Sequence, residues 1–235
     1  MTTDEPAAAS STDEGLTWRE LAVARSLDSA RTRAESRVQR FMDAALELVN
    51  SGLGKDFTVQ EVVERSGQSL RSFYQYFEGK HELLLALFEE SVNSTAEYLE
   101  QRIGEVEGPL ERLHCFVVEY HELCRPEQST DRDHTLALPV MAEFAWQLLT
   151  EHPQQAARAF VPLVTMYEEL LEKAVSAGAV RSDYVSLRMT GVVLQAIMFN
   201  AFSSTIGGVT KKSDDGAAEE LWGLLYRGIG TPNGS

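Results

Sequence analysis

The sequence predicts an all-α protein, and three observations lead to that fold class. Apolar residues recur at intervals of three and four along most of the chain, which is the period of a helix with one buried face. Gly, Pro and short polar runs separate these segments, and no convincing alternation of apolar and polar residues indicates a strand. The chain has 235 residues, 43% of them hydrophobic, and is therefore long enough to bury a sizeable core.

The N-terminal part divides into a tail and two helical segments. Residues 1–15 are acidic and rich in Ser, Thr and Ala, so we expect a disordered tail. Residues 16–33 have a short helical pattern, and a stronger helix is expected at about 34–50. The apolar residues of the shorter pattern include Trp18, Leu21, Val23 and Leu27.

Two short helices follow, joined by a turn. A helix at 58–65 begins with a capping box, in which the Thr58 hydroxyl and the Glu61 carboxylate bind free backbone amides. A link that contains Gly67 joins it to a helix at 70–77. This is the helix-turn-helix arrangement, whose second helix lies in the major groove of DNA. Taken alone, the same shape also fits an ordinary helical hairpin.

The second short helix has one apolar side and one polar side. On a helical wheel, Leu70, Phe73 and Phe77 share the side that would pack on the first short helix. Arg71 and Gln75 point away from that core, and their side chains can read base edges, Arg at guanine and Gln at adenine. The flanks carry hydroxyls that can reach phosphate oxygens, from Ser72 and Tyr74.

The rest of the chain is predicted to be helical by the same test. A longer helix begins near Lys80 and reaches about Arg102. Later helices are expected at about 109–124, 138–150, 154–177, 183–206 and 217–228.

Several short runs occur at the spacing of a known family. They are Phe57-Thr58-Val59, Ser66-Gly67, Ser69, Phe73-Tyr74, Tyr76-Phe77, Lys80 and Leu83-Leu84, preceded by Ala44-Ala45-Leu46-Glu47-Leu48. Together they resemble the signature of the TetR/AcrR transcriptional regulators, over about residues 34–90. The resemblance implies a homodimer with a three-helix DNA-binding domain at 34–80. It also implies a larger helical domain at 81–230 for effector binding and dimerisation.

The resemblance also implies roles for individual residues. Phosphate contacts are implied for Thr58, Ser69, Ser72, Tyr74, Tyr76 and Lys80. Arg71 and Gln75 lie where the family varies its base readers. Leu70 departs from the pattern, because the family usually has a polar or basic residue there, and Gln68 replaces a common small apolar one.

The leading segment at 16–33 is longer than the family needs, and two interpretations stay open. It is an arm whose arginines, Arg33 among them, reach the DNA backbone or minor groove. Alternatively, it is a helix packed on its own domain through Trp18, Leu21 and Leu27. The other arginines of this segment are Arg19, Arg25 and Arg31.

Aromatic and Met residues recur in the later helices, where the resemblance implies an effector pocket. Such a lining suits a hydrophobic small molecule, although plain core packing is the alternative for most of these residues. The candidate ligand-binding residues are Phe116, Tyr120, Met141, Phe144, Met166, Tyr167, Gln195, Met198 and Phe202. The last two predicted helices are apolar over more than one face, which suggests a dimer contact through Val192, Met198, Leu221, Trp222 and Leu225.

The charge of the chain is unevenly distributed. The net charge of −15 argues against a nucleic-acid-binding protein if it is taken as an average. However, residues 16–80 carry ten Lys and Arg against nine acidic residues, whereas residues 81–235 carry eleven against 23. The acidity therefore lies outside the predicted DNA-binding segment.

Other classes of function find little support. We see no nucleophile elbow, phosphate loop or zinc-protease motif, so an enzyme is not expected. His114, His121 and Cys124 share one helix face but are too widely spaced for a metal site by themselves. No cofactor is expected. The N-terminus does not resemble a signal peptide and no run is long enough to span a membrane, so we expect a cytoplasmic protein.

The sequence therefore predicts a TetR-like repressor that binds double-stranded operator DNA as a homodimer. The operator would be palindromic, and a hydrophobic small-molecule effector would release the protein from it. The alternative is a helical ligand-binding or scaffold protein without operator binding.

Overall fold

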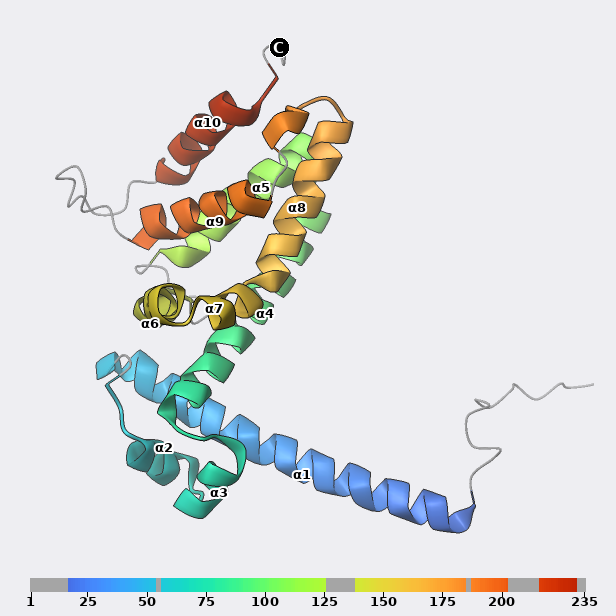
Figure 1. Cartoon of the computed structure of the whole chain (residues 1–235), viewed down its shortest axis with the longest axis vertical. Coiled ribbons are helices and arrows are strands. Elements are labelled where there is room, and N and C mark those ends of the chain that lie inside the picture. Colours follow the sequence, from blue (N-terminus) through green and yellow to red (C-terminus); the bar gives the residue numbers. More distant parts are fainter. Residues whose placement is uncertain (1–16, 54–55, 126–137, 185–186, 203–215, 232–235) are drawn as a thin grey trace, which may run out of the picture.

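The computed structural model describes residues 17–53, 56–125, 138–184, 187–202 and 216–231. They form ten α-helices, with a π-helical turn after the first and a 3₁₀ turn before the ninth (Figure 1). In these ranges the sole β interaction is an isolated bridge between Val180 and Gly230. The predicted all-α fold class is confirmed. The predicted tail at 1–15 lies outside the described residues.

The helices follow one another with short connections. They are α1 (Trp18–Leu48), α2 (Val59–Ser66), α3 (Leu70–Tyr76), α4 (Lys80–Gly104), α5 (Pro109–Cys124), α6 (Leu138–Glu151), α7 (Pro153–Ala159), α8 (Val161–Ser176), α9 (Leu187–Phe202) and α10 (Ala217–Ile229).

The first helix corrects the expected division at residue 33. Helix α1 is continuous over 31 residues, because no Gly or Pro interrupts the sequence from its cap to Leu48. A capping box between Thr17 and Glu20 starts it. Its N-terminal half does not pack on its own domain: Trp18 is 76% exposed and Leu27 65%.

Two later segments also differ from the expected boundaries. The predicted helix at 154–177 is divided into α7 and α8 at Phe160. Pro162 follows directly; proline lacks an amide hydrogen and suits the first turn of a helix, so a new helix begins there. The segment expected to start at Asp183 begins with a 3₁₀ turn, and α9 follows from Leu187.

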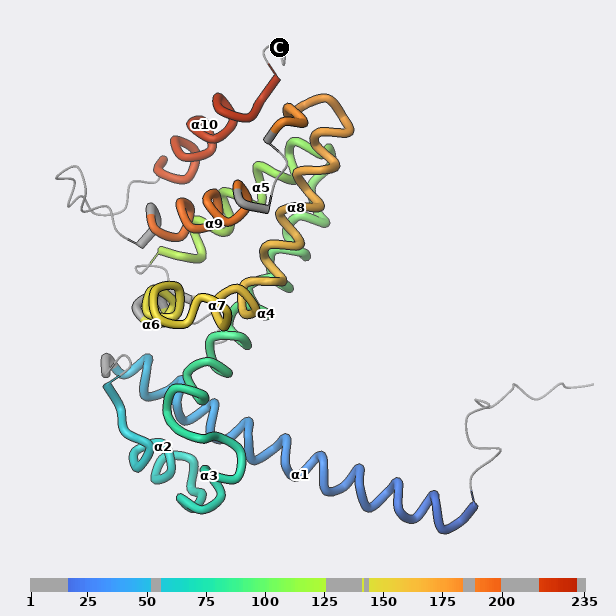
Figure 2. Tube along the Cα trace, in the orientation of Figure 1, coloured from blue at the N-terminus to red at the C-terminus, as the bar shows by residue number. Residues whose placement is uncertain are grey.

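The helices form a small unit at one end of the molecule and a larger one beyond it. The C-terminal half of α1 packs with α2, α3 and the start of α4, and α4 then leads away from this unit (Figures 1 and 2). In the larger unit, α5 is central and packs against α4, α8, α9 and α10. None of the described helices is both long enough and apolar enough to cross a membrane.

Candidate nucleic-acid interface and effector core

The turn between α2 and α3 is set by Gly67 and Ser69. Gly67 has a left-handed backbone with φ of 65°, and the amide of Gln68 donates to the carbonyl of Val63 at 3.3 Å. The Ser69 hydroxyl then caps α3 by accepting from the amide of Ser72 at 3.1 Å. The turn therefore ends one helix and starts the next within three residues.

Aromatic packing fixes which side of α3 faces outward. Phe73 is fully buried, with its ring edge-to-face on Phe41 of α1 at 5.4 Å and against Phe77 at 5.4 Å. Arg71 and Gln75, on the opposite side of the helix, are exposed. The predicted placement of Leu70 beside Phe73 is wrong, because the Leu70 side chain is 43% exposed.

A depression of about 440 Å³ lies between this surface and α1. Arg37 and Arg40 of α1 form one wall of it. The other walls come from Gly67, Gln68, Ser69, Arg71, Ser72 and Gln75. The Gln68 side-chain amide donates to the carbonyl of Arg37 at 2.8 Å, which fastens the turn to α1.

Arg37 and Arg40 were not among the predicted site residues. The sequence shows these arginines, but it contains no signal that brings this face of α1 beside the turn. Three arginines and no carboxylate line the depression. Its chemistry suits phosphate groups, which guanidinium groups bind through paired N–H donors.

The other predicted phosphate-binding residues lie around this surface in different settings. Thr58 is exposed and caps α2, with its amide 2.6 Å from the Glu61 carboxylate. Hydrogen bonds from Thr58 lower the pKa of Glu61 below its ordinary value. Tyr74 is 56% exposed, whereas Tyr76 is half-buried.

Two predicted contacts are engaged or shielded within the chain. The Lys80 ammonium donates to the carbonyl of Phe57 at 2.8 Å and lies over the Phe57 ring. The Ser72 hydroxyl is shielded from solvent and has no hydrogen-bond partner among the described residues. Arg33 lies outside the depression, on the exposed part of α1.

The candidate effector residues separate into different places. Phe116, Tyr120 and Tyr167 lie together in the core between α5 and α8, with ring centroids 5.5 and 5.8 Å apart. Phe144 and Met141 are buried on α6, and the Phe144 ring lies against His81 and Phe88 of α4 instead.

Three further candidates are less enclosed or lie outside the description. Met198 is half-buried against the core, and Gln195 is exposed on α9. The side chain of Phe202 lies outside the described residues. Met166 is half-buried and lines a separate hollow.

Tyr120 is the polar group in the aromatic core. Its hydroxyl is fully buried and has no hydrogen-bond partner of good geometry in the described part of the chain. Burial raises its pKa well above the ordinary value, and burial also raises the pKa of the neighbouring Cys124 thiol to about 12. Both groups therefore stay protonated and neutral at physiological pH.

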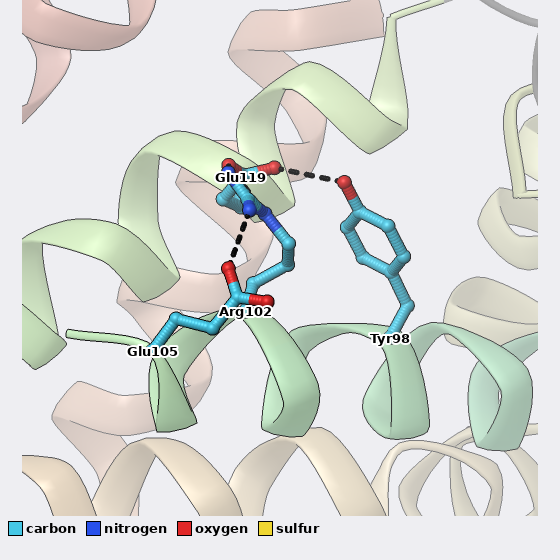
Figure 3. Close-up of polar contacts among 4 residues, drawn as sticks. All are labelled: Tyr98, Arg102, Glu105 and Glu119. Carbon is cyan, nitrogen blue, oxygen red and sulfur yellow. Dashed lines mark hydrogen bonds and ion pairs between the residues drawn. The ribbon is translucent and has the colours of Figure 1, made fainter.

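The hollow beside Met166 is of a different kind. It has a volume of about 670 Å³, lies between α4, α5 and α8, and has an acidic wall that includes Glu90, Glu97 and Glu169. Beside it, Arg102 joins α4 to α5 by binding Glu119 at 3.0 Å (Figure 3). This polar hollow is unlike the apolar pocket expected from the sequence.

The histidines proposed for a metal site have other contacts. His114 lies 2.9 Å from a carboxylate oxygen of Glu219 and its ring lies against Trp222. His121 and Cys124 are buried. Within the described ranges, no three His, Cys, Asp or Glu side chains are grouped so that they could hold a metal ion.

The last two helices expose apolar side chains. Val192 and Phe199 of α9 are about half exposed and Leu224 of α10 is 68% exposed, with Trp146 of α6 beside Phe199 at 6.0 Å. Leu221, by contrast, is buried within the subunit. The candidate dimer surface therefore overlaps the predicted one without being identical to it.

Known proteins share both the short motif and the fold. Residues 41–87 match the model of the bacterial regulatory proteins of the tetR family. A crystal structure of the transcriptional regulator FadR from Bacillus subtilis, in complex with stearoyl-CoA, superposes with a TM-score of 0.62 at 18% identity. The superposition covers 81% of this chain and 98% of that one. No curated protein matches the sequence of the chain.

Two other solved structures are similar. A TetR/AcrR-family regulator from Thermobifida fusca has a TM-score of 0.59 at 18% identity, over 82% of this chain and 98% of that one. AibR, in complex with isovaleryl coenzyme A and operator DNA, has a TM-score of 0.55 at 18% identity, over 81% and 98%. Residues 41–87 therefore form the DNA-binding domain of the TetR family, and the chain as a whole has the fold of the transcriptional regulators of that family.

Proposed function

We propose that the chain is a repressor that binds a palindromic operator as a dimer and leaves it when a hydrophobic effector binds. The observation that carries the proposal is the outward face of α3. Arg71 and Gln75 are exposed there, and Arg37 and Arg40 stand across the depression from them. Base-reading and phosphate-binding groups thus occur on one surface.

The division of labour on this surface follows from chemistry. Arg71 can bind guanine with two hydrogen bonds and Gln75 can bind adenine in the same way, so these two residues supply sequence preference. Arg37, Arg40 and the N-cap Ser69 supply contacts to the phosphate backbone, which fix the register of α3 in the groove.

A dimer is supported by the exposed apolar residues of α9 and α10. Val192, Phe199 and Leu224 would leave water if the same helices of a second copy covered them. A twofold dimer presents two copies of α3 to half-sites about 34–36 Å apart, and a palindromic operator follows from that symmetry. Such a regulator acts in the cytoplasm, where its operator lies.

The effector site that we propose is the aromatic core around Tyr120. Its walls are apolar, and the unpartnered hydroxyl offers one hydrogen bond to a polar atom of a ligand. Two of the similar structures contain acyl-CoA thioesters, which supports a ligand with an acyl chain. Release requires that the ligand binds more tightly to a conformation whose α3 helices are wrongly spaced for the operator.

The proposal is tested by replacing the two base readers. The operator is obtained by enrichment of random duplexes with the wild-type protein and from the intergenic DNA beside its gene. In the R71A/Q75A variant we expect preference for the operator over scrambled DNA to fall by at least about tenfold, because each good base contact contributes about 1–3 kcal/mol of discrimination.

A matched control is available on α2. The Q60A/R65A variant also removes one Gln and one Arg, but neither residue lines the depression, so its preference for the operator should be that of the wild type. If the wild-type protein shows no sequence-preferring, salt-dependent binding, the regulator is not a repressor of this kind. The base readers are wrongly assigned if both variants behave alike.

A further inference from the structure

The exposed N-terminal half of α1 carries a line of basic residues. At 100° per residue, Arg19, Arg33, Arg37 and Arg40 fall within about 60° of one another around the helix axis. All four are exposed. Between them this face has only small residues, namely Ala22, Ser26, Ser29 and Ala30. We call the four arginines the basic stripe.

The acidic residues of the same helix segment lie elsewhere. Glu20, Asp28 and Glu35 lie about 100–180° round the helix from Arg19. Arg31 is on their side and binds Glu35 at 2.7 Å. In the described part of the chain no carboxylate is paired with an arginine of the basic stripe. Arg33 donates to the backbone carbonyl of Ser29, which leaves its positive charge uncompensated.

The position of the stripe relates it to the DNA-binding surface. Its inner members, Arg37 and Arg40, are the wall of the depression that faces Arg71 and Gln75. Figure 1 shows that the N-terminal end of α1 extends past α3, at the same end of the molecule, opposite α10. A duplex seated on α3 would therefore continue along the outer part of α1.

We propose that the outer part of the basic stripe, Arg19 and Arg33, binds the phosphate backbone of the DNA that flanks each operator half-site. The helix is about 27 Å long from Arg19 to Arg37 at 1.5 Å per residue, which corresponds to about eight base pairs at 3.4 Å each. The stripe has no group between its arginines that reads a base edge, so the contact adds affinity and footprint length without sequence preference. This inference rests on the proposed operator binding.

The test compares two double variants of the full chain that lose the same charge. R19Q/R33Q removes the outer part of the stripe, whereas R25Q/R31Q removes two arginines of the same segment that point away from it. Glutamine retains the helix propensity of arginine, so circular dichroism should be unchanged. The readouts are operator affinity across a series of salt concentrations and the length of DNA protected in a footprint.

We expect R19Q/R33Q to bind the operator with a salt slope shallower by about two per subunit, because each phosphate contact contributes about 0.9. Its footprint should be several base pairs shorter on each flank, and its sequence preference should be retained. Wild type and R25Q/R31Q should bind more weakly when the duplex ends at the half-sites, whereas R19Q/R33Q should not. Equal slopes and equal footprints for the two variants would overturn the inference. Failure of the wild-type protein to prefer any operator would instead overturn the proposed function.

Discussion

At position 73, a phenylalanine ring lies fully buried between Phe41 of α1 and Phe77. It is the buried residue of α3, a helix of seven residues that has little stability by itself. Arg71 and Gln75, each two positions away, project to the other side because two residues turn the helix by about 200°. The orientation of the two base readers therefore depends on one aromatic contact.

Phe73→Ala should cost about 3–5 kcal/mol in free energy of unfolding, since it removes a large buried ring and leaves a cavity. Gln75→Ala, two residues further along, should change it by less than about 0.5 kcal/mol, because the side chain is exposed. Chemical denaturation of both variants measures the difference. Similar stabilities would mean that Phe73 does not anchor α3.

Among the helices, α2 begins with a reciprocal cap. The Thr58 amide and hydroxyl donate to the Glu61 carboxylate, and the Glu61 amide donates back to the Thr58 hydroxyl at 3.2 Å. Hydrogen bonds from Thr58 hold the pKa of Glu61 below its ordinary value of 4.5. The folded state therefore favours the deprotonated carboxylate over the protonated one.

The cap predicts a pH-dependent stability with a definite sign. The contribution of Glu61 is complete above about pH 4.5 and is lost as the pH falls through the lower folded-state pKa. Glu61→Gln, which retains a hydrogen-bonding amide without the charge, should lower the midpoint of thermal unfolding at neutral pH. The difference from the wild type should vanish in acid. Glu64→Gln on the same helix is the control, and a pH-independent difference for Glu61→Gln would contradict the prediction.

Over the whole molecule, α4 connects the DNA-binding unit to the effector core. At its start, the His81 ring lies 3.0 Å from the side-chain oxygen of Gln155 on α7 and packs against Phe144 of α6. Further along, α4 packs against α5 and α8, which carry Tyr120 and Tyr167. A change in the packing of this core therefore has a continuous path to the position of α3.

Tyr120→Phe tests the proposed effector core. Removing a buried hydroxyl without a partner should leave the free energy of unfolding unchanged or raise it by about 1 kcal/mol. The same change should weaken the release of operator DNA by acyl-CoA thioesters, measured with chains from isovaleryl to stearoyl. Tyr98→Phe is the matched control, since the Tyr98 hydroxyl donates to Glu119 outside this core. If no thioester releases DNA from the wild type, this ligand class is wrong.

The helix-turn-helix could be predicted from the sequence because its determinants are local. The capping residues, Gly67 and the apolar spacing of residues 59–77 act within one or two turns of helix, so neighbouring residues suffice to specify them. The same reasoning misplaced Leu70, since a wheel shows which residues share a side but not how much of that side a partner covers.

The sequence by itself determined that the chain is helical, where most helices begin and end, and which residues of α3 face away from its core. The tertiary structure alone decided that α1 is one long helix with an exposed N-terminal half. It also decided that Arg37 and Arg40 stand beside the turn, and that the aromatic candidates separate into Phe144 on α6 and a cluster around Tyr120. Periodicity specifies the faces of each helix, because side chains repeat every 3.6 residues. Which faces meet depends on packing between residues far apart in the chain, and no local pattern records it.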